Sequence, residues 1–290
     1  MPSYLVTGAG GQLGQCFQSV AAEFPQHHLL FTKRSEVDIN QPETLENFYA
    51  QSPFEGIINC AAYTQVDQAE TEFKEAHQVN TQGVENLSVF AEAKNIRLIH
   101  FSTDFVFDGT KKTPYLEADS TNPLSVYGKS KLAGERILNQ SNCQFVCFRV
   151  SWLFSPFGKN FVKTILNASQ SKSELGVVEG QFGKPTYGLD LARSVVSNLD
   201  HPQLYNHPIY HFAQGSKTNW YEFAAKIIAL AGSPCKVKPI ASFDFPTAAK
   251  RPLNSALDTQ RIEKTLSLSI PTWETALVKC VKQIQKNEVI

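Results

Sequence analysis

Tyr127 and Lys131 lie four residues apart in a stretch, VYGKSK, that predicts a helix. Positions i and i+4 share one face of a helix, so the phenol and the ammonium would point into the same space. A free tyrosine has a pKa of about 10, and a fixed cation nearby would lower that pKa because it favours the phenolate. Tyr127 is therefore a candidate acid/base. The alternative is a tyrosine that packs beside an exposed lysine, since a lone Tyr-x-x-x-Lys pair often arises by chance.

A third polar group precedes this pair. Residues 97–101 predict a buried strand, and Ser102-Thr103-Asp104 follows it directly. Side chains at the C-terminal ends of parallel strands lie at the edge where such sheets bind ligands. The Thr103 hydroxyl would bind the reacting oxygen, Tyr127 would transfer the proton, and Lys131 would lower the pKa of Tyr127 while holding the nicotinamide ribose. These three groups together predict a nicotinamide-dependent oxidoreductase.

The start of the chain predicts the cofactor site. Residues 3–7 form a strand pattern, Gly8-Ala9-Gly10-Gly11-Gln12-Leu13-Gly14 follows at once, and a helical pattern continues to about Phe24. In this order the glycines let the backbone approach a pyrophosphate, and the helix N-terminus favours its negative charge. The alternative is a tight turn rich in glycine.

Basic residues follow the second predicted strand, residues 28–32, which ends in Lys33-Arg34-Ser35. Sites that prefer NADH commonly place an acid here, whereas basic residues accommodate the 2′-phosphate of NADPH. Lys33 and Arg34 therefore favour NADPH, with NADH as the alternative cofactor. A pair of solvated surface cations is the other interpretation. Asp38 follows, and its carboxylate could receive the adenine amino group.

A third buried strand is predicted at residues 56–62. Its end, Ala61-Ala62-Tyr63-Thr64, would lie at the ligand-binding edge, where small residues let the cofactor lie close. A helical stretch at residues 73–95 follows. Asn80 within it is either structural or hydrogen-bonded to the backbone of the active site.

The alternation of strands and helices predicts an α/β fold: a Rossmann-type doubly wound parallel sheet with a smaller, interleaved C-terminal substrate lobe. Residues 1–150 would form the dinucleotide-binding domain, with a fifth strand at 145–150. Residues 151–290 would mainly form the substrate lobe, with some segments returning to the first domain. We expect helices at 158–170, 188–199, 219–231 and 272–286, strands near 175–179 and 208–213, and an irregular loop at 233–256.

Composition excludes some classes of protein. The chain has 290 residues, 42% hydrophobic and 19% charged, with zero net charge. A general nucleic-acid binder usually carries a basic excess, so none is expected. No stretch approaches the roughly 18 apolar residues of a membrane span, and the N-terminus lacks a signal-peptide pattern, so no membrane association is expected. The six cysteines form no Cys-x-x-Cys pair, which predicts small buried residues in a reducing cytoplasm and no metal site.

Longer runs resemble a known family. Thr7-Gly8-x-x-Gly11-x-x-Gly14 together with Thr103, Tyr127 and Lys131 resembles the extended short-chain dehydrogenase/reductases. The match to the dTDP-4-dehydrorhamnose reductases within that family is closer and runs nearly end to end. It is carried by NCAAYTQVDQAE (59–70), STDFVFDG (102–109), YGKSKLAGE (127–135), SW (151–152), QFGKPT (181–186) and RPLNS (251–255).

The resemblance implies residue roles. Gly11, Gln12 and Leu13 would bind the pyrophosphate, and Asp38 and Ile39 the adenine. The ribose side would be bound by Ala62, Tyr63 and Thr64, and the sugar by Thr103, Asp104 and Trp152. Trp152 lies just past the fifth strand, and the sequence pattern leaves open whether it packs in the core or lines the substrate pocket. Arg251 would contact the diphosphate, since a guanidinium suits that geometry, or else fix a loop.

The implied reaction is NAD(P)H-dependent reduction of the C4 ketone of dTDP-4-dehydro-β-L-rhamnose, the last step of dTDP-L-rhamnose biosynthesis for surface polysaccharide such as lipopolysaccharide. Two alternatives stay open: another nucleotide-4-ketosugar reductase, or a non-catalytic NADP-binding regulatory subunit like that of methionine adenosyltransferase. Some family members dimerise through glutamates that hold magnesium, but Gln15 and Cys16 occupy the corresponding place here. We therefore expect no metal, and a monomer or a homodimer.

Overall fold

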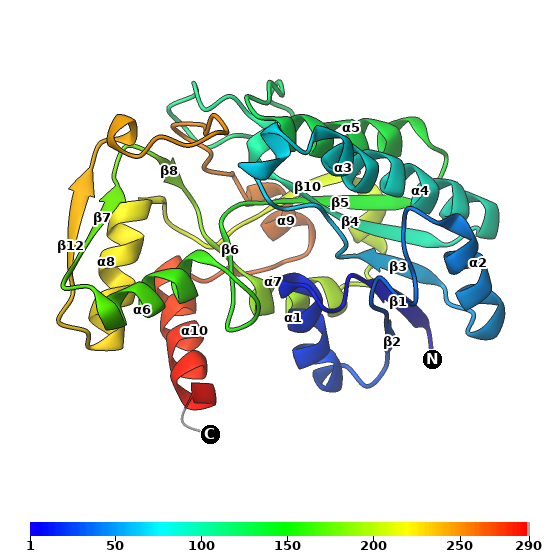
Figure 1. Cartoon of the computed structure of the whole chain (residues 1–290). Helices are drawn as coiled ribbons and strands as arrows, with labels where there is room; N and C mark the ends of the chain where they lie inside the picture. The colour runs from blue at the N-terminus through cyan, green and yellow to red at the C-terminus, as the bar shows by residue number, and fades with distance from the viewer. Residues whose placement is uncertain (289–290) are drawn as a thin grey trace.

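A six-stranded parallel sheet forms the centre of the part of the chain that the computed structural model describes, residues 1–288 (Figure 1). The strand order is β10-β5-β4-β3-β1-β2. Strands such as β3, GIIN, are apolar and fully buried, as expected where helices cover both faces of a parallel sheet. The strands are β1 Ser3–Thr7, β2 His28–Phe31, β3 Gly56–Asn59, β4 Arg97–Thr103, β5 Phe145–Val150 and β10 Ile209–Phe212.

Helices cover both faces of this sheet. On one face, α1 (Gln12–Val20) packs against α7 (Gly188–Val196) over a large apolar core. The other face is covered by α2 (Pro42–Gln51), α4 (Gly83–Lys94) and α5 (Val126–Gln140). In Figure 1, α4 and α5 lie above the sheet and α2 lies at its right-hand end. The predicted doubly wound α/β fold is therefore confirmed. The strand order changes direction between β1 and β3, and ligands bind at such switch points.

The predicted helix at 73–95 is interrupted. It consists of α3 (Phe73–His77), a π-helical turn (Gln78–Gln82) and α4. Single π turns inside α-helices are frequent at functional sites. The π-helical turn directs the side chain of Asn80 toward the backbone of Tyr63, just after β3.

The C-terminal part forms a smaller layer on the left of Figure 1. Strand β7 (Glu174–Val178) pairs in parallel with β12 (Lys236–Ile240), and α6 (Phe161–Ser171) and α8 (Trp220–Ala231) pack beside them. Helix α10 (Trp273–Glu288) packs against α8. Further short elements are β6 (Leu153–Phe154) with β9 (Thr186–Tyr187), β8 (Phe182–Gly183) with β11 (Thr218–Asn219), and α9 (Gln260–Thr265).

The prediction of an irregular loop at 233–256 was wrong for β12. Lys236–Ile240 pairs with β7 over its whole length, Val237 opposite Leu175 and Ile240 opposite Val178. Pro239 weakens the strand signal in the sequence because proline cannot donate a ladder hydrogen bond. Pro239 is tolerated in β12 because this strand pairs on one side only, within a two-stranded sheet.

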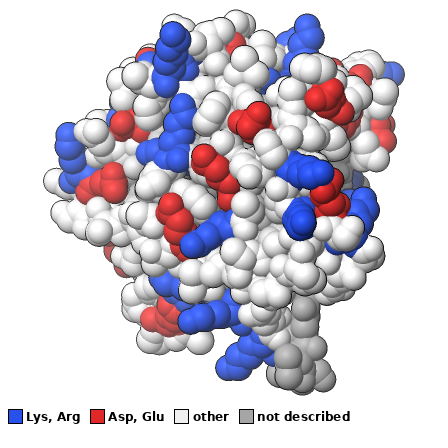
Figure 2. Space-filling model, turned by 90° about the vertical axis from the view of Figure 1, so that its left-hand side faces the viewer, with Lys and Arg blue, Asp and Glu red and all other residues white. Residues whose placement is uncertain are grey.

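Charged side chains are dispersed over the face of the C-terminal layer. On the face that Figure 2 shows, Lys and Arg alternate with Asp and Glu in small groups between uncharged residues. Lys238 and Glu174, for instance, form an ion pair across β12 and β7 at 2.7 Å. None of the described helices combines the length and apolarity needed to cross a membrane.

Candidate active site

The glycine loop between β1 and α1 has the geometry of an anion cradle. Gly8 has a φ of +63°, and a Cβ there would lie 2.7 Å from the Ala61 nitrogen, so only glycine fits. A Cβ on Gly10 would meet nothing within 4 Å, which leaves open space beside the loop. Gly11 is the N-cap residue of α1, so no capping side chain accepts from the N–H groups of the first turn, and no acidic residue lies in that turn. The N–H groups at this end of α1 are therefore available to a negatively charged group.

The end of β3 lies against this loop. Asn80 in the π turn accepts a hydrogen bond from the Tyr63 nitrogen at 2.9 Å and donates to the Tyr63 carbonyl at 3.0 Å. The same amide donates to the Ser130 hydroxyl on α5 at 3.0 Å. Asn80 thus joins the Ala61–Thr64 segment to the helix that carries Tyr127, so its role is to hold the backbone of the site.

The first turn of α5 places Tyr127 beside the end of β4. Ser125 caps this helix, its hydroxyl accepting from the Gly128 nitrogen at 3.1 Å. A Cβ on Gly128 would lie 2.3 Å from the Phe105 carbonyl oxygen, so a glycine lets the helix approach this closely. The Phe105 ring packs edge-on against the Tyr127 ring with centroids 5.8 Å apart. The first turn of α5 therefore lies close to the end of β4, where Thr103 is placed.

The pKa of Tyr127 departs from the sequence-based expectation. Burial raises the pKa of Tyr127 to about 12, and a hydrogen bond with Thr103 opposes that rise. Lys131 is buried, and its Nζ donates to the Phe101 carbonyl at 2.7 Å rather than to the phenol. The expected lowering of the Tyr127 pKa by Lys131 is therefore wrong. Burial also lowers the pKa of Lys131 to about 8.

Asp104 is a buried carboxyl at the same edge. Its Oδ1 accepts from the Thr103 hydroxyl at 3.1 Å, while its Oδ2 is buried without a hydrogen-bond partner among the described residues. Burial raises the pKa of Asp104 to about 7, and the neighbouring hydroxyls of Ser255 and Thr103 oppose that rise. A protonated Asp104 can donate a hydrogen bond from this position to a ligand oxygen.

Asp104→Asn should change the pH dependence of unfolding. The pKa of Asp104 lies above its usual 3.8 in the folded state, so its contribution to stability is present below about pH 4 and is lost as the pH rises toward 7. We expect the free energy of unfolding of Asp104→Asn, relative to wild type, to increase between pH 4 and 8 by a few kcal/mol. Denaturant unfolding at pH 4.5, 6 and 8 measures this difference.

Asp108→Asn is the matched control, because hydrogen bonds to Thr110 lower the pKa of Asp108 to about 2. Asp108 is ionised in both states above pH 5, so its difference from wild type should stay constant from pH 5 to 8. The same constant difference for Asp104→Asn would contradict the raised pKa of Asp104.

A cavity of about 400 Å³ opens next to these residues. Trp152 and Trp220 form one wall, their rings stacked with centroids 3.5 Å apart. Trp152 has a φ of +48°, in the left-handed region. A Cβ on Gly183 would lie 2.5 Å from the Trp152 indole, so a glycine is needed at 183 for the ring to take this position. Trp152 therefore lines the cavity. The other lining residues are Phe105, Phe161, Thr164, Ile165, Gly176, Val177, Val178, Gln181, Phe245, Thr247, Arg251, Pro252 and Ser255.

Arg251 is the cation of this cavity. Its guanidinium forms a two-pronged ion pair with Asp67, at 3.0 and 2.7 Å, and also donates to the Ala249 carbonyl. Asp67 lies after β3 and also accepts from the Ala249 nitrogen at 3.1 Å. The pair joins the loop after β3 to the C-terminal part, so Arg251 fixes a loop and at the same time borders the cavity.

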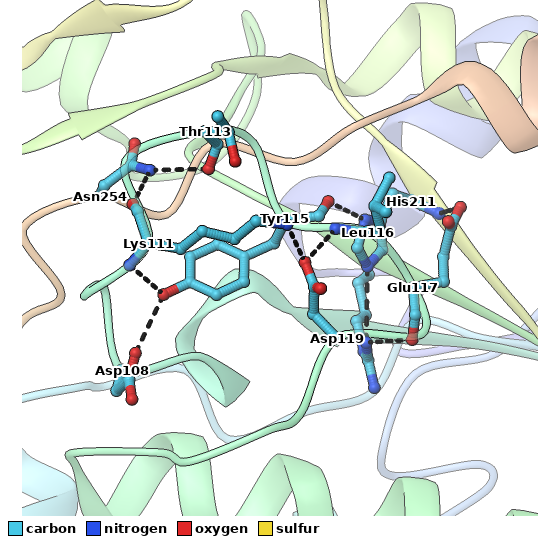
Figure 3. A network of polar contacts seen from close by, with 10 residues as sticks. Asp108, Lys111, Thr113, Tyr115, Leu116, Glu117, Asp119, His211 and Asn254 are labelled. Carbon is cyan, nitrogen blue, oxygen red and sulfur yellow. Dashed lines mark hydrogen bonds and ion pairs between the residues drawn. The ribbon is translucent and has the colours of Figure 1, made fainter.

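A polar network fixes the loop between β4 and α5 (Figure 3). The Tyr115 hydroxyl donates to Asp108 Oδ1 at 3.0 Å, and the Tyr115 carbonyl lies 3.1 Å from Nδ1 of the buried His211. Asn254 donates to the Thr113 carbonyl at 3.2 Å. Because Asn254 precedes Ser255, this network holds the hydroxyl of Ser255 beside the cavity and near Asp104.

Comparisons with known proteins identify the family. The family model described as "RmlD substrate binding domain" matches residues 3–286. A dTDP-4-dehydrorhamnose reductase of Aggregatibacter actinomycetemcomitans is 38% identical over 287 residues, which cover 96% of this chain and 97% of that protein. The chain belongs to the dTDP-4-dehydrorhamnose reductase family.

Solved structures of this family have the same fold. The dTDP-4-dehydrorhamnose reductase of Clostridium acetobutylicum superposes with a TM-score of 0.92 at 35% identity, covering 98% of this chain and 99% of that one. That of Bacillus anthracis, solved in complex with NADP, has a TM-score of 0.92 at 32% identity, covering 98% of this chain and 100% of that one. The resemblance to the dTDP-4-dehydrorhamnose reductases that the sequence predicts is confirmed.

The residues expected at the adenine end, from Lys33 to Ile39, follow strand β2. Lys33 and Arg34 are exposed after β2, and Arg34 is ion-paired with Asp38 at 3.0 Å. Both Asp38 oxygens are engaged, since Oδ1 accepts from the Asn40 nitrogen. Ile39 is buried against Gly83, and a Cβ on Gly83 would lie 2.7 Å from the Ile39 side chain.

The remaining residues expected at the pyrophosphate begin α1: Gln12, Leu13 and Gly14. The Gln12 side chain donates to the Leu153 carbonyl at 3.2 Å.

Several site residues escaped the sequence-based prediction. Three of them border the site: Trp220, Ser255 and Asp67. Trp220 stacks on Trp152 and Asp67 pairs with Arg251, and in both pairs the two residues are far apart in the sequence. Ser255 and Asp67 lie inside the family-like runs, which was the one available signal. Among the described residues no three His, Cys, Asp or Glu side chains are grouped so as to hold a metal ion.

Proposed function

We propose that the protein reduces the C4 ketone of dTDP-4-dehydro-β-L-rhamnose with NADPH, using Tyr127 as the proton donor. The carrying observation is the placement of Tyr127, Thr103 and Asp104 at the C-terminal edge of the sheet, between the glycine cradle and the tryptophan-lined cavity. The family to which the chain belongs supplies the substrate class.

The glycine cradle and the end of β3 suit a dinucleotide. The glycine loop and the first turn of α1 would hold the pyrophosphate, because the open space at Gly10 and the N–H groups that begin α1 suit an anion. Ala61, Ala62, Tyr63 and Thr64 would border the ribose, with Asn80 fixing their backbone. The chemistry that bound NADPH supplies is hydride transfer to the carbonyl carbon.

The chain's own residues would manage the oxygen of the reacting ketone. The Thr103 hydroxyl, which donates to Asp104 Oδ1 in this structure, would turn its proton to that oxygen. The phenol of Tyr127 would give the oxygen its proton as negative charge develops. A pKa near 12 keeps Tyr127 protonated at neutral pH, so the proton is in place before the substrate arrives.

The cavity would hold the nucleotide sugar. Trp152 and Trp220 offer stacked apolar faces, and Arg251 offers a cation at the rim. The guanidinium would bind the diphosphate with the donors that remain beside Asp67. Asp104, with its unpartnered Oδ2, would bind a sugar hydroxyl.

Consumption of NADPH tests the proposal. We expect absorbance of NADPH to fall with dTDP-4-dehydro-β-L-rhamnose as substrate, and to fall much more slowly with nucleotide ketosugars of other configuration. Binding of NADPH without turnover on any ketosugar would contradict an enzymatic role and favour a regulatory one.

The Lys33→Ala/Arg34→Ala variant tests cofactor preference. We expect its Michaelis constant for NADPH to rise about ten-fold or more, and that for NADH to change little, because only NADPH carries a 2′-phosphate for these cations to bind. Steady-state kinetics with both cofactors measure the ratio. Lys172→Ala, which removes another exposed lysine just after α6, is the control. Equal changes for the two cofactors would contradict the assignment.

A cytoplasmic location is part of the proposal. All six cysteines are free, and five of them are buried. Free thiols persist in reducing compartments. Thiol titration of protein extracted without reductant would show six free thiols if the proposal holds, and disulfides would contradict it.

A further inference from the structure

A ladder of buried polar side chains crosses the sheet and ends on Lys131. Thr7, Asn59 and His100 are register partners on β1, β3 and β4, so their side chains project on one face. The Thr7 hydroxyl donates to Asn59 Oδ1 at 2.7 Å, and Asn59 Nδ2 lies 3.1 Å from His100 Nδ1. His100 Nε2 lies 3.4 Å from the Nζ of Lys131. All four side chains are at most 2% exposed, so water cannot substitute for any of these contacts.

The ladder fixes which nitrogen of His100 carries the proton. The Ala61 N–H lies 3.1 Å from Asn59 Oδ1 and can only donate, so that atom is the amide oxygen. The NH₂ group of Asn59 therefore faces His100, and Nδ1 of His100 must accept. Burial holds the pKa of His100 well below its usual range, so the ring is neutral. A neutral ring with Nδ1 as acceptor carries its proton on Nε2.

The Nε2–H of His100 therefore points at Lys131. An ammonium has three donors and no acceptor, so it cannot bond to an N–H that faces it. The uncharged amine of Lys131 has a lone pair that accepts from Nε2–H, and it can still donate to the Phe101 carbonyl at 2.7 Å. The geometry at Lys131 matches the amine rather than the ammonium.

We propose that His100 is a positioning residue that stabilises the uncharged amine of Lys131 and so sets the pH range over which Lys131 is charged. The charge of Lys131 bears on the site because Lys131 shares a helix face with Tyr127. The inference rests on the reductase function proposed above, in which Tyr127 is the proton donor.

Other groups around Lys131 also shift its pKa. Glu135, one turn further along α5, and Cys147, on the neighbouring strand β5, both raise the pKa of Lys131. Burial lowers it and is the largest effect, giving a value of about 8. The donor on His100 acts with burial, since both favour the amine.

NMR of the cofactor-free protein with ¹³C- and ¹⁵N-labelled lysine tests the inference. The Lys131 resonance is assigned by its loss in Lys131→Arg, and its pKa is read from a pH titration. We expect His100→Phe, which keeps a planar ring but lacks Nε2–H, to raise the pKa of Lys131 by about one unit. His100→Gln, whose amide can replace the donor, should raise it less. An unchanged pKa in His100→Phe would overturn the inference.

His211→Phe is the matched control. His211 is also a fully buried histidine of the sheet, but its Nε2 faces Arg149 rather than Lys131, so its loss should leave the Lys131 titration unchanged. If His100→Phe does not fold, the ¹⁵N resonances of His100 in the wild-type protein decide. A proton on Nε2 supports the inference, and a proton on Nδ1 overturns it. Neither readout depends on turnover, so a failure of the reductase proposal is distinguishable from a failure of this one.

Discussion

Tyr127→Phe is expected to lower kcat by about a hundred-fold or more, the scale of general-acid catalysis. Phenylalanine retains the ring that packs edge-on against Phe105 at 5.8 Å, so the shape of the site is kept. What is lost is the hydroxyl that would protonate the sugar oxygen. NADPH should still bind, because the glycine cradle after β1 is untouched. Steady-state kinetics and a fluorescence titration with NADPH measure the two effects separately.

Tyr210→Phe is the control for this prediction. Tyr210 is a fully buried tyrosine of β10 whose hydroxyl donates to the Gln203 carbonyl at 3.2 Å, and it lies outside the proposed site. Loss of its hydroxyl should leave kcat nearly unchanged. Turnover of Tyr127→Phe within a few-fold of wild type would remove Tyr127 from the mechanism.

Arg149→Met is expected to lower the free energy of unfolding by about 3–5 kcal/mol. Arg149 on β5 and Glu135 on α5 form a buried ion pair, with Nη2 to Oε2 at 2.7 Å and side chains 4% and 2% exposed. Removing the guanidinium leaves the carboxylate of Glu135 without its partner in the interior. Glu135 shares a helix face with Tyr127 and Lys131, spaced four residues apart, so this pair also anchors the catalytic face of α5. Urea unfolding measures the change.

The double variant Arg149→Met/Glu135→Met separates lost pairing from lost packing. Replacing both charges of a buried pair by apolar groups is often close to neutral, so the double variant should recover much of the stability lost in Arg149→Met. A double variant no more stable than the single one would show that the unpaired charge of Glu135 is not the cause.

The sequence permitted prediction of the parts of the site that depend on local spacing. Tyr127 and Lys131 fall on one helix face, Thr103 follows a strand, and the glycines follow the first strand, because each pattern is set by the period of its own element. The doubly wound sheet followed from the same alternation. These features required no knowledge of which segments meet in space.

Features that depend on long-range packing could not be predicted. Arg251 and Asp67 are 184 positions apart, and the stacking of Trp152 on Trp220 depends on a positive φ at Trp152 and on Gly183. The pKa of Tyr127 was expected to fall because the cation was visible in the sequence, whereas the burial that raises it was not. Strand β12 was missed because its pairing with β7 outweighs the weak strand preference of a segment that contains Pro239.

The most direct measurement uses NADPH that carries deuterium at the transferable position of the nicotinamide, with dTDP-4-dehydro-β-L-rhamnose as substrate and NMR of the product. We expect dTDP-β-L-rhamnose with deuterium at C4, formed at a rate that Tyr127→Phe lowers about a hundred-fold or more. Deuterium at another carbon, the opposite configuration at C4, or no transfer by a protein that binds NADPH would contradict it.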